Sequence, residues 1–135
     1  IPAAYQRFEH GVMVWDSDLD MMHVLLDNGT NYFMYDEWQE TPVTYNEMPP
    51  AGYLLPERGF GYLWVTYEEI RTQMGWATAP EQSYIMTRQR VKNDFGSYFS
   101  GYAIRGPIYF SLPDERVVRA GLSDFYQGGG WVYME

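Results

Sequence analysis

The chain of 135 residues contains no cysteine and only one lysine, Lys92. The absence of cysteine excludes disulfides and thiolate metal sites. Nine basic residues stand against 18 acidic ones, which gives a net charge of −9 at pH 7. Nucleic-acid binding needs clustered cations that neutralise phosphates, and anionic membrane surfaces attract the same side chains. The composition therefore excludes nucleic acid as a partner and disfavours adsorption to a membrane.

Long apolar runs are also missing from the sequence. No stretch approaches the roughly 18 residues of a membrane-spanning helix, so we expect no membrane insertion. No signal peptide is recognisable, although the chain begins with Ile-Pro-Ala-Ala and not with methionine. That beginning fits a processed secreted chain and a trimmed fragment equally well.

Histidine is scarce, with His10 and His23 as its only occurrences. A catalytic triad or a histidine metal site needs partners at set geometry, and no nucleophile motif accompanies either residue. We therefore interpret both as structural. Carboxylate pairs hydrolyse glycosides in some enzymes, but 18 acidic residues produce pairs by chance. We expect neither an enzyme nor a cofactor.

Aromatic residues are abundant at 19% of the chain, with 13 tyrosines and 5 tryptophans. Every buried tyrosine hydroxyl needs a partner or a water molecule, so this number exceeds what a core requires. We expect most tryptophans to fill the core and some aromatic surface to contact protein or sugar. The candidates for such an interface or ligand site are Trp76, Tyr98, Tyr102, Tyr126, Trp131 and Tyr133.

Strand patterns fill the first and last parts of the chain. In residues 1–36, apolar side chains alternate around Val12 to Trp15, and Asn28-Gly29 between two apolar runs predicts a tight hairpin. Residues 37–56 hold four prolines and predict an extended connector. Residues 82–135 are again strand-like and end in three glycines before a short apolar strand. That terminal strand can pair in its own sheet or with a neighbouring chain.

The joint between the two halves, residues 57–81, contains the expected helix. Thr66 is a suitable N-cap, and Glu69 lies three residues later, where its carboxylate can reach back to the cap. Gly75 can adopt the left-handed geometry that ends a helix. The pattern predicts one short helix at about residues 67–74.

Two short motifs have both a functional and a structural interpretation. Asp16, Asp18 and Asp20 have the spacing of the first ligands of a calcium loop, but Met21 occupies the position that requires glycine. An acidic turn between strands is the preferred interpretation, with calcium as the weaker one. Asn28-Gly29-Thr30 matches the acceptor pattern for N-glycosylation, and the hairpin turn explains the same residues.

Residues 74–81, Met-Gly-Trp-Ala-Thr-Ala-Pro-Glu, and residues 6–15, Gln-Arg-Phe-Glu-His-Gly-Val-Met-Val-Trp, resemble the LGFP-like repeats of bacterial surface proteins. Met74 stands where those repeats usually have leucine. The two halves of the chain also form a weak internal repeat, because residues 23–33 align with residues 108–118 as strand, turn and strand. The resemblance implies an exported, non-catalytic module linked to the cell envelope or to polysaccharide, and it supplies no catalytic residue.

Together these observations predict a single mostly-β domain made of two imperfect β-hairpin repeats. We expect the halves to form a small sandwich or barrel-like domain with the one short helix. The expected function is a secreted or cell-surface structural module that self-associates, as a subunit of a surface filament or fibre. A monomeric module that binds glycan or cell wall is the open alternative. The expected partner is accordingly a second copy of the chain or a polysaccharide.

Overall fold

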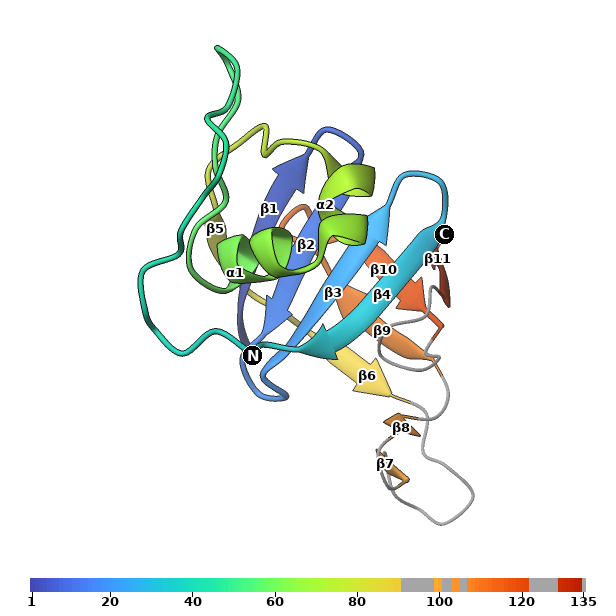
Figure 1. The fold of residues 1–135 in the computed structure, drawn as a ribbon. Helices are drawn as coiled ribbons and strands as arrows, with labels where there is room; N and C mark the ends of the chain where they lie inside the picture. The colour runs from blue at the N-terminus through green and yellow to red at the C-terminus, as the bar shows by residue number, and fades with distance from the viewer. Residues whose placement is uncertain (91–98, 101–102, 105–106, 122–128, 135) are drawn as a thin grey trace.

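The computed structural model describes residues 1–90, 99–100, 103–104, 107–121 and 129–134. These residues form a nine-stranded antiparallel sheet, a separate two-stranded ladder and two short helices (Figure 1). The mostly-β class predicted from the alternating apolar residues is therefore confirmed.

Four strands of the first half follow one another as a meander. They are β1 (Pro2–Phe8), β2 (Gly11–Asp16), β3 (Met21–Leu26) and β4 (Thr30–Tyr35), and each pairs with the next. The predicted hairpin joins β3 to β4. Gly29 takes a φ of 89°, and the Oδ1 atom of Asn28 accepts a hydrogen bond from the backbone N of Thr30 over 2.9 Å. Only the glycine of the Asn-Gly pair uses left-handed backbone geometry.

The second half completes the sheet. Its strands are β5 (Gln82–Ile85), β6 (Arg88–Arg90), β9 (Ile108–Ser111), β10 (Val117–Ala120) and β11 (Gly129–Tyr133), in the order β5-β1-β2-β3-β4-β11-β10-β9-β6. The strands β7 (Phe99–Ser100) and β8 (Ala103–Ile104) form the separate ladder. The terminal strand β11 pairs with both β4 and β10, so it lies inside its own sheet and is not an open edge.

The sheet folds back on itself around an apolar core. Residues of β2, β3 and β4, such as Val14, Leu25 and Phe33, belong to the same buried cluster as Ile108 and Phe110 of β9. Figure 1 shows β6, β9 and β10 lying behind β2, β3 and β4. The strand pairs of the described residues nevertheless make an open sheet with β5 and β6 at its edges. They show neither the closed barrel nor the two-sheet sandwich that the sequence led us to expect.

Two helices replace the single predicted one. They are α1 (Arg58–Thr66) and α2 (Glu68–Met74), so Thr66 ends the first helix and does not cap the second. Tyr67 is the N-cap of α2 and makes no side-chain cap bond. Two glycines within residues 58–66 lower the helix propensity of this segment, so the sequence did not predict α1. Gly75 ends α2 with a φ of 73°, as predicted.

Both helices cover the front face of the sheet in Figure 1. Phe60, Leu63 and Trp64 of α1 share a buried cluster with Met22 and Val24 of β3. Strand β3 is buried at all six positions because it has one core on each face. The connector from residue 36 to residue 57 contains no helix and no strand, apart from one isolated bridge between Leu54 and Ala77. This agrees with the extended connector predicted from its prolines.

Candidate functional site

Small side chains leave a hollow on the helix-bearing face of the sheet, beside the start of α1. Ala4 of β1 pairs with Ser83 of β5 on one side and with Trp15 of β2 on the other. Pro2 continues this floor two residues before Ala4, and Gly59 of α1 borders it. The result is a pocket of about 570 Å³, which is within the range of ligand sites in proteins.

Aromatic side chains form the walls of this pocket, which we call the Trp38 pocket. They are Trp15, Trp38 and Phe60, whereas the ring of Tyr84, which also borders the pocket, packs against the core on the other face of the sheet. The indole Nε1 of Trp15 donates to Oδ1 of Asp20 over 3.0 Å, and that of Trp38 donates to the carbonyl of Thr41 over 2.7 Å. Because protein acceptors already hold the polar edge of both indoles, the rings offer a ligand mainly their apolar surface.

Charged side chains stand at the edge of the Trp38 pocket. They are Asp36, Arg58 and Glu81, and Nη1 of Arg58 lies 3.8 Å from Oε2 of Glu81. Burial raises the pKa of the Asp36 carboxyl, and the nearby Asp20 raises it further, while the backbone hydrogen bond from Trp38 lowers it. Burial likewise raises the pKa of Glu81, partly offset by Arg58. Two carboxyl groups against one guanidinium make the site unfavourable for anionic ligands.

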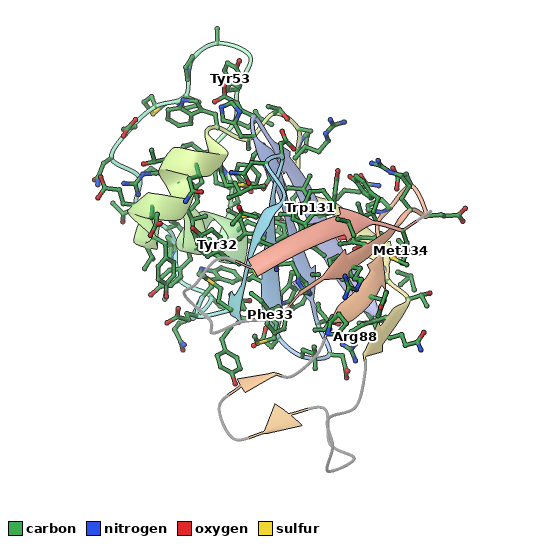
Figure 2. All side chains as sticks on the ribbon, turned by 90° about the vertical axis from the view of Figure 1, so that its right-hand side faces the viewer. Tyr32, Phe33, Tyr53, Arg88, Trp131 and Met134 are labelled. Atoms are coloured by element: carbon green, nitrogen blue, oxygen red, sulfur yellow. The ribbon has the colours of Figure 1, made fainter. Side chains whose placement is uncertain are left out.

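A second pocket, of about 320 Å³, adjoins the first, and Glu81 lines both. Gln6 of β1, Glu57 and Pro80 line it, and the connector contributes Met48, Pro49, Tyr53, Leu54 and Leu55. We call it the Tyr53 pocket. Figure 2 shows Tyr53 on the connector loop, at the end of the molecule away from Arg88.

Of the aromatic residues singled out from the sequence, the three that the structure describes line neither pocket. Trp131 and Tyr133 of β11 contact each other edge to face, with ring centroids 5.0 Å apart, and Nε1 of Trp131 donates to the carbonyl of Leu26 over 2.7 Å. Trp76 instead packs 5.3 Å from Trp64 beside the core under the helices. The other three candidates, Tyr98, Tyr102 and Tyr126, lie outside the described residues.

The three aspartates of the calcium hypothesis form a turn between β2 and β3. Asp16 is buried, and its Oδ1 accepts hydrogen bonds of 3.0 Å from the backbone N atoms of Asp18 and Leu19. The guanidinium of Arg88 donates to Oδ2 of Asp16 over 2.5 Å and to Oδ2 of Asp18 over 2.7 Å. A side-chain cation thus occupies the place that the hypothesis assigned to calcium. In the described part of the chain, no cluster of three or more acidic or histidine side chains is arranged to hold a metal ion.

Sequence reasoning missed the residues of the Trp38 pocket because they come from separate segments of the chain. Trp15, Trp38, Arg58 and Glu81 carry no motif together, and only the packing of β1, β2, β5, α1 and the connector brings them to one place. The available signal was the run of small residues at Pro2, Ala3 and Ala4, which leaves room above a strand.

Comparison with known proteins adds no assignment to this geometry. No family model matches the chain, and neither the curated proteins nor the solved structures searched contain a match. Among the helices that the structure describes, none is long and apolar enough to cross a membrane.

Proposed function

We propose that this protein is a non-catalytic module that binds glycan in the Trp38 pocket. The observation that carries this proposal is the placement of Trp15 and Trp38 above a floor of small side chains, with carboxyl groups at the edge. Apolar faces of sugar rings stack on aromatic rings, and sugar hydroxyls donate hydrogen bonds to carboxylates.

Charge supports a neutral glycan. The pocket edge carries Asp36 and Glu81 against Arg58, and the whole chain has a net charge of −9. Polymers of uronic acids would meet repulsion from the protein as a whole and from the site.

The proposed location is outside the cell, at a cell wall or surface polymer. The support is the resemblance of residues 6–15 and 74–81 to LGFP-like repeats, which we retain as a proposal. In the structure these two segments lie together: the backbone N of Glu9 donates to the carbonyl of Trp76 over 2.9 Å, and the N of Trp76 donates to Oε1 of Glu9 over 2.9 Å. The two motif segments thus form one structural unit, as a repeat module requires.

We further propose that the sheet closes as a flattened barrel in solution. The edges β5 and β6 are separated only by Met86 and Thr87. The backbone N of Met86 donates to the carbonyl of Ile1 over 2.7 Å, and the N of Ser111 donates to the carbonyl of Thr87 over 2.9 Å. These bonds join Met86 to the first half of the chain and Thr87 to the second half, which supports closure of the sheet into a barrel.

Retention on insoluble polysaccharides tests the glycan proposal. The purified protein is mixed with cellulose, chitin, xylan or a pectic polymer, and the bound fraction is measured after washing. We expect retention on at least one neutral polymer and about a tenfold loss of affinity for Trp38→Ala. Tyr35→Ala is the matched control, because Tyr35 is an exposed aromatic residue of β4 outside both pockets. Equal retention of the two variants would remove the Trp38 pocket as the site.

Self-association, the first function expected from the sequence, remains a second candidate, at the sheet edge that also borders the Trp38 pocket. Strand β5 has the uncharged sequence Gln-Ser-Tyr-Ile, lies at a sheet edge, and exposes 75% of Ile85. Soluble proteins usually guard such edges with charge or proline. Sedimentation velocity over a wide concentration range, with Ile85→Lys as the comparison, tests it. A wild-type chain that stays monomeric at every concentration excludes this candidate.

A further inference from the structure

The two pockets lie in line along a single strand. Pro2 and Ala4 line the Trp38 pocket, and Gln6 lines the Tyr53 pocket. Alternate residues of a strand point to the same face, and two residues advance about 6.8 Å. The second hollow therefore begins about one strand period beyond the first, on the same face of β1, with Glu81 between them.

The two pockets share part of their chemistry. Each combines an aromatic wall, Trp38 in one and Tyr53 in the other, with the Glu81 carboxyl group that both share. A ligand made of repeating units can place one unit in each pocket.

Gln6, which lines the second pocket, has a hydrogen-bond acceptor without a partner among the described residues. Its side chain is only 3% exposed, and its Nε2 atom donates to the carbonyl of Ala79 over 3.0 Å. That bond fixes the orientation of the amide group. Its Oε1 atom then has no hydrogen-bond donor among the residues that the structure describes. A buried amide oxygen without a partner is unfavourable, so a hydroxyl group delivered by a ligand, directly or through one water molecule, would supply what the fold does not.

We propose that the ligand is a linear oligosaccharide that runs along β1 and fills both pockets, crossing Glu81. This inference rests on the proposed function and deepens it, because it names a chain of several sugar rings and not a terminal sugar or a disaccharide. The Trp38 pocket holds one end of the bound stretch, and the Tyr53 pocket holds the other.

Titration calorimetry with soluble β-1,4-linked oligomers of N-acetylglucosamine and of glucose tests the inference. We expect the hexasaccharide of the preferred sugar to bind about tenfold more tightly than the disaccharide. Tyr53→Ala should remove that advantage and weaken hexasaccharide binding far more than disaccharide binding, whereas Trp38→Ala should weaken both. Gln6→Leu should act like Tyr53→Ala, and circular dichroism shows that each variant is folded. Tyr35→Ala again serves as the control.

The outcomes separate the two proposals. Equal affinity for disaccharide and hexasaccharide overturns the two-pocket inference while the glycan site stands. Equal loss of affinity for both lengths in Tyr53→Ala overturns it as well, because the effect would then not be local to the second pocket. If the wild-type chain binds no oligosaccharide and is not retained on any polymer, the glycan function itself is wrong.

Discussion

Arg88 at the sheet edge reaches the buried Asp16 at the end of β2, 72 positions earlier in the chain, with 2.5 Å between Nη1 and Oδ2. The side chain of Asp16 is fully buried and that of Arg88 is only 10% exposed. A carboxylate in such a place depends on its partner, because desolvation of an unpaired charge is costly. The contact therefore ties the edge strand β6 to the turn between β2 and β3.

Removal of this guanidinium should be strongly destabilising. Arg88→Gln leaves the Asp16 carboxylate buried with only its two backbone donors, and we expect a loss of about 3 kcal/mol in the free energy of unfolding. Urea denaturation followed by tryptophan fluorescence measures it. The control is Arg116→Gln, which breaks a 2.6 Å pair with Asp114 whose side chains are both about half exposed. That pair should contribute less than about 1 kcal/mol. Similar losses for the two variants would contradict this account.

His23 of β3 should make the protein less stable in acid. Its ring lies 4.6 Å from that of Phe33 and 4.3 Å from that of Phe110, and neither ring nitrogen has a hydrogen-bond partner among the described residues. Burial lowers the pKa of His23 from 6.5 to about 3, a shift to which Arg88 adds and which Asp16 opposes. The unfolded chain therefore binds a proton between pH 6.5 and 3 that the folded chain does not. Stability should fall as pH drops through that window, by up to about 1.4 kcal/mol per pH unit.

The variant His23→Leu isolates this effect. Leucine cannot be protonated and leaves no buried ring nitrogen unpaired, so the difference in stability between variant and wild type should grow as the pH falls from 6.5. Asp36 and Glu81 act in the opposite sense, because their folded pKa values are raised, but they are present in both proteins and cancel. Urea unfolding at several pH values provides the comparison. Parallel pH profiles for the two proteins would show that His23 is not the cause.

Local signals in the sequence were enough for the β class and for the turn between β3 and β4, but not for the turn between β1 and β2 or for the way the strands assemble. Gly29 and Gly75 both take the positive φ that their positions predicted. The helix α1 was missed because the reason for its glycines is tertiary: a Cβ on Gly59 would lie 2.6 Å from Cε of Met22 on β3. The Trp38 pocket was missed for the same reason, since its floor exists only when Ala4 pairs with Ser83. Propensity is a local property, whereas a cavity depends on the register of strands far apart in the chain.

Gly59→Ala should weaken ligand binding more than it weakens the fold. The added Cβ would meet the terminal methyl of Met22, which is flexible, and would lie 2.9 Å from Oδ1 of Asp36. Both residues line the Trp38 pocket, and relief of the clash must displace them. We expect a change in stability of less than about 1.5 kcal/mol, together with a measurable loss of retention on the polysaccharide that the wild type binds. Unchanged retention would show that the position of Asp36 does not matter to the ligand.

Gly61→Ala tests whether packing or helix propensity decides the sequence of α1. Propensity alone predicts a gain of about 1 kcal/mol, because alanine is the better helix former. However, a Cβ at this position would lie 2.5 Å from the carbonyl oxygen of Pro56 and 2.6 Å from Oη of Tyr45, which donates a hydrogen bond to that same carbonyl. The backbone of Pro56 cannot move aside as a side chain end can, so we expect a loss of about 1–3 kcal/mol.

The matched control for that variant is Thr72→Ala at an exposed position of α2, where propensity acts without a neighbour to disturb. It should gain a few tenths of a kcal/mol in the free energy of unfolding. Urea denaturation of the two variants beside the wild type gives both values under one condition. Opposite signs are expected, because alanine improves a helix only where the fold leaves room for its methyl group. A gain at both positions would mean that the connector does not pack against α1 as closely as the bond between Tyr45 and Pro56 requires.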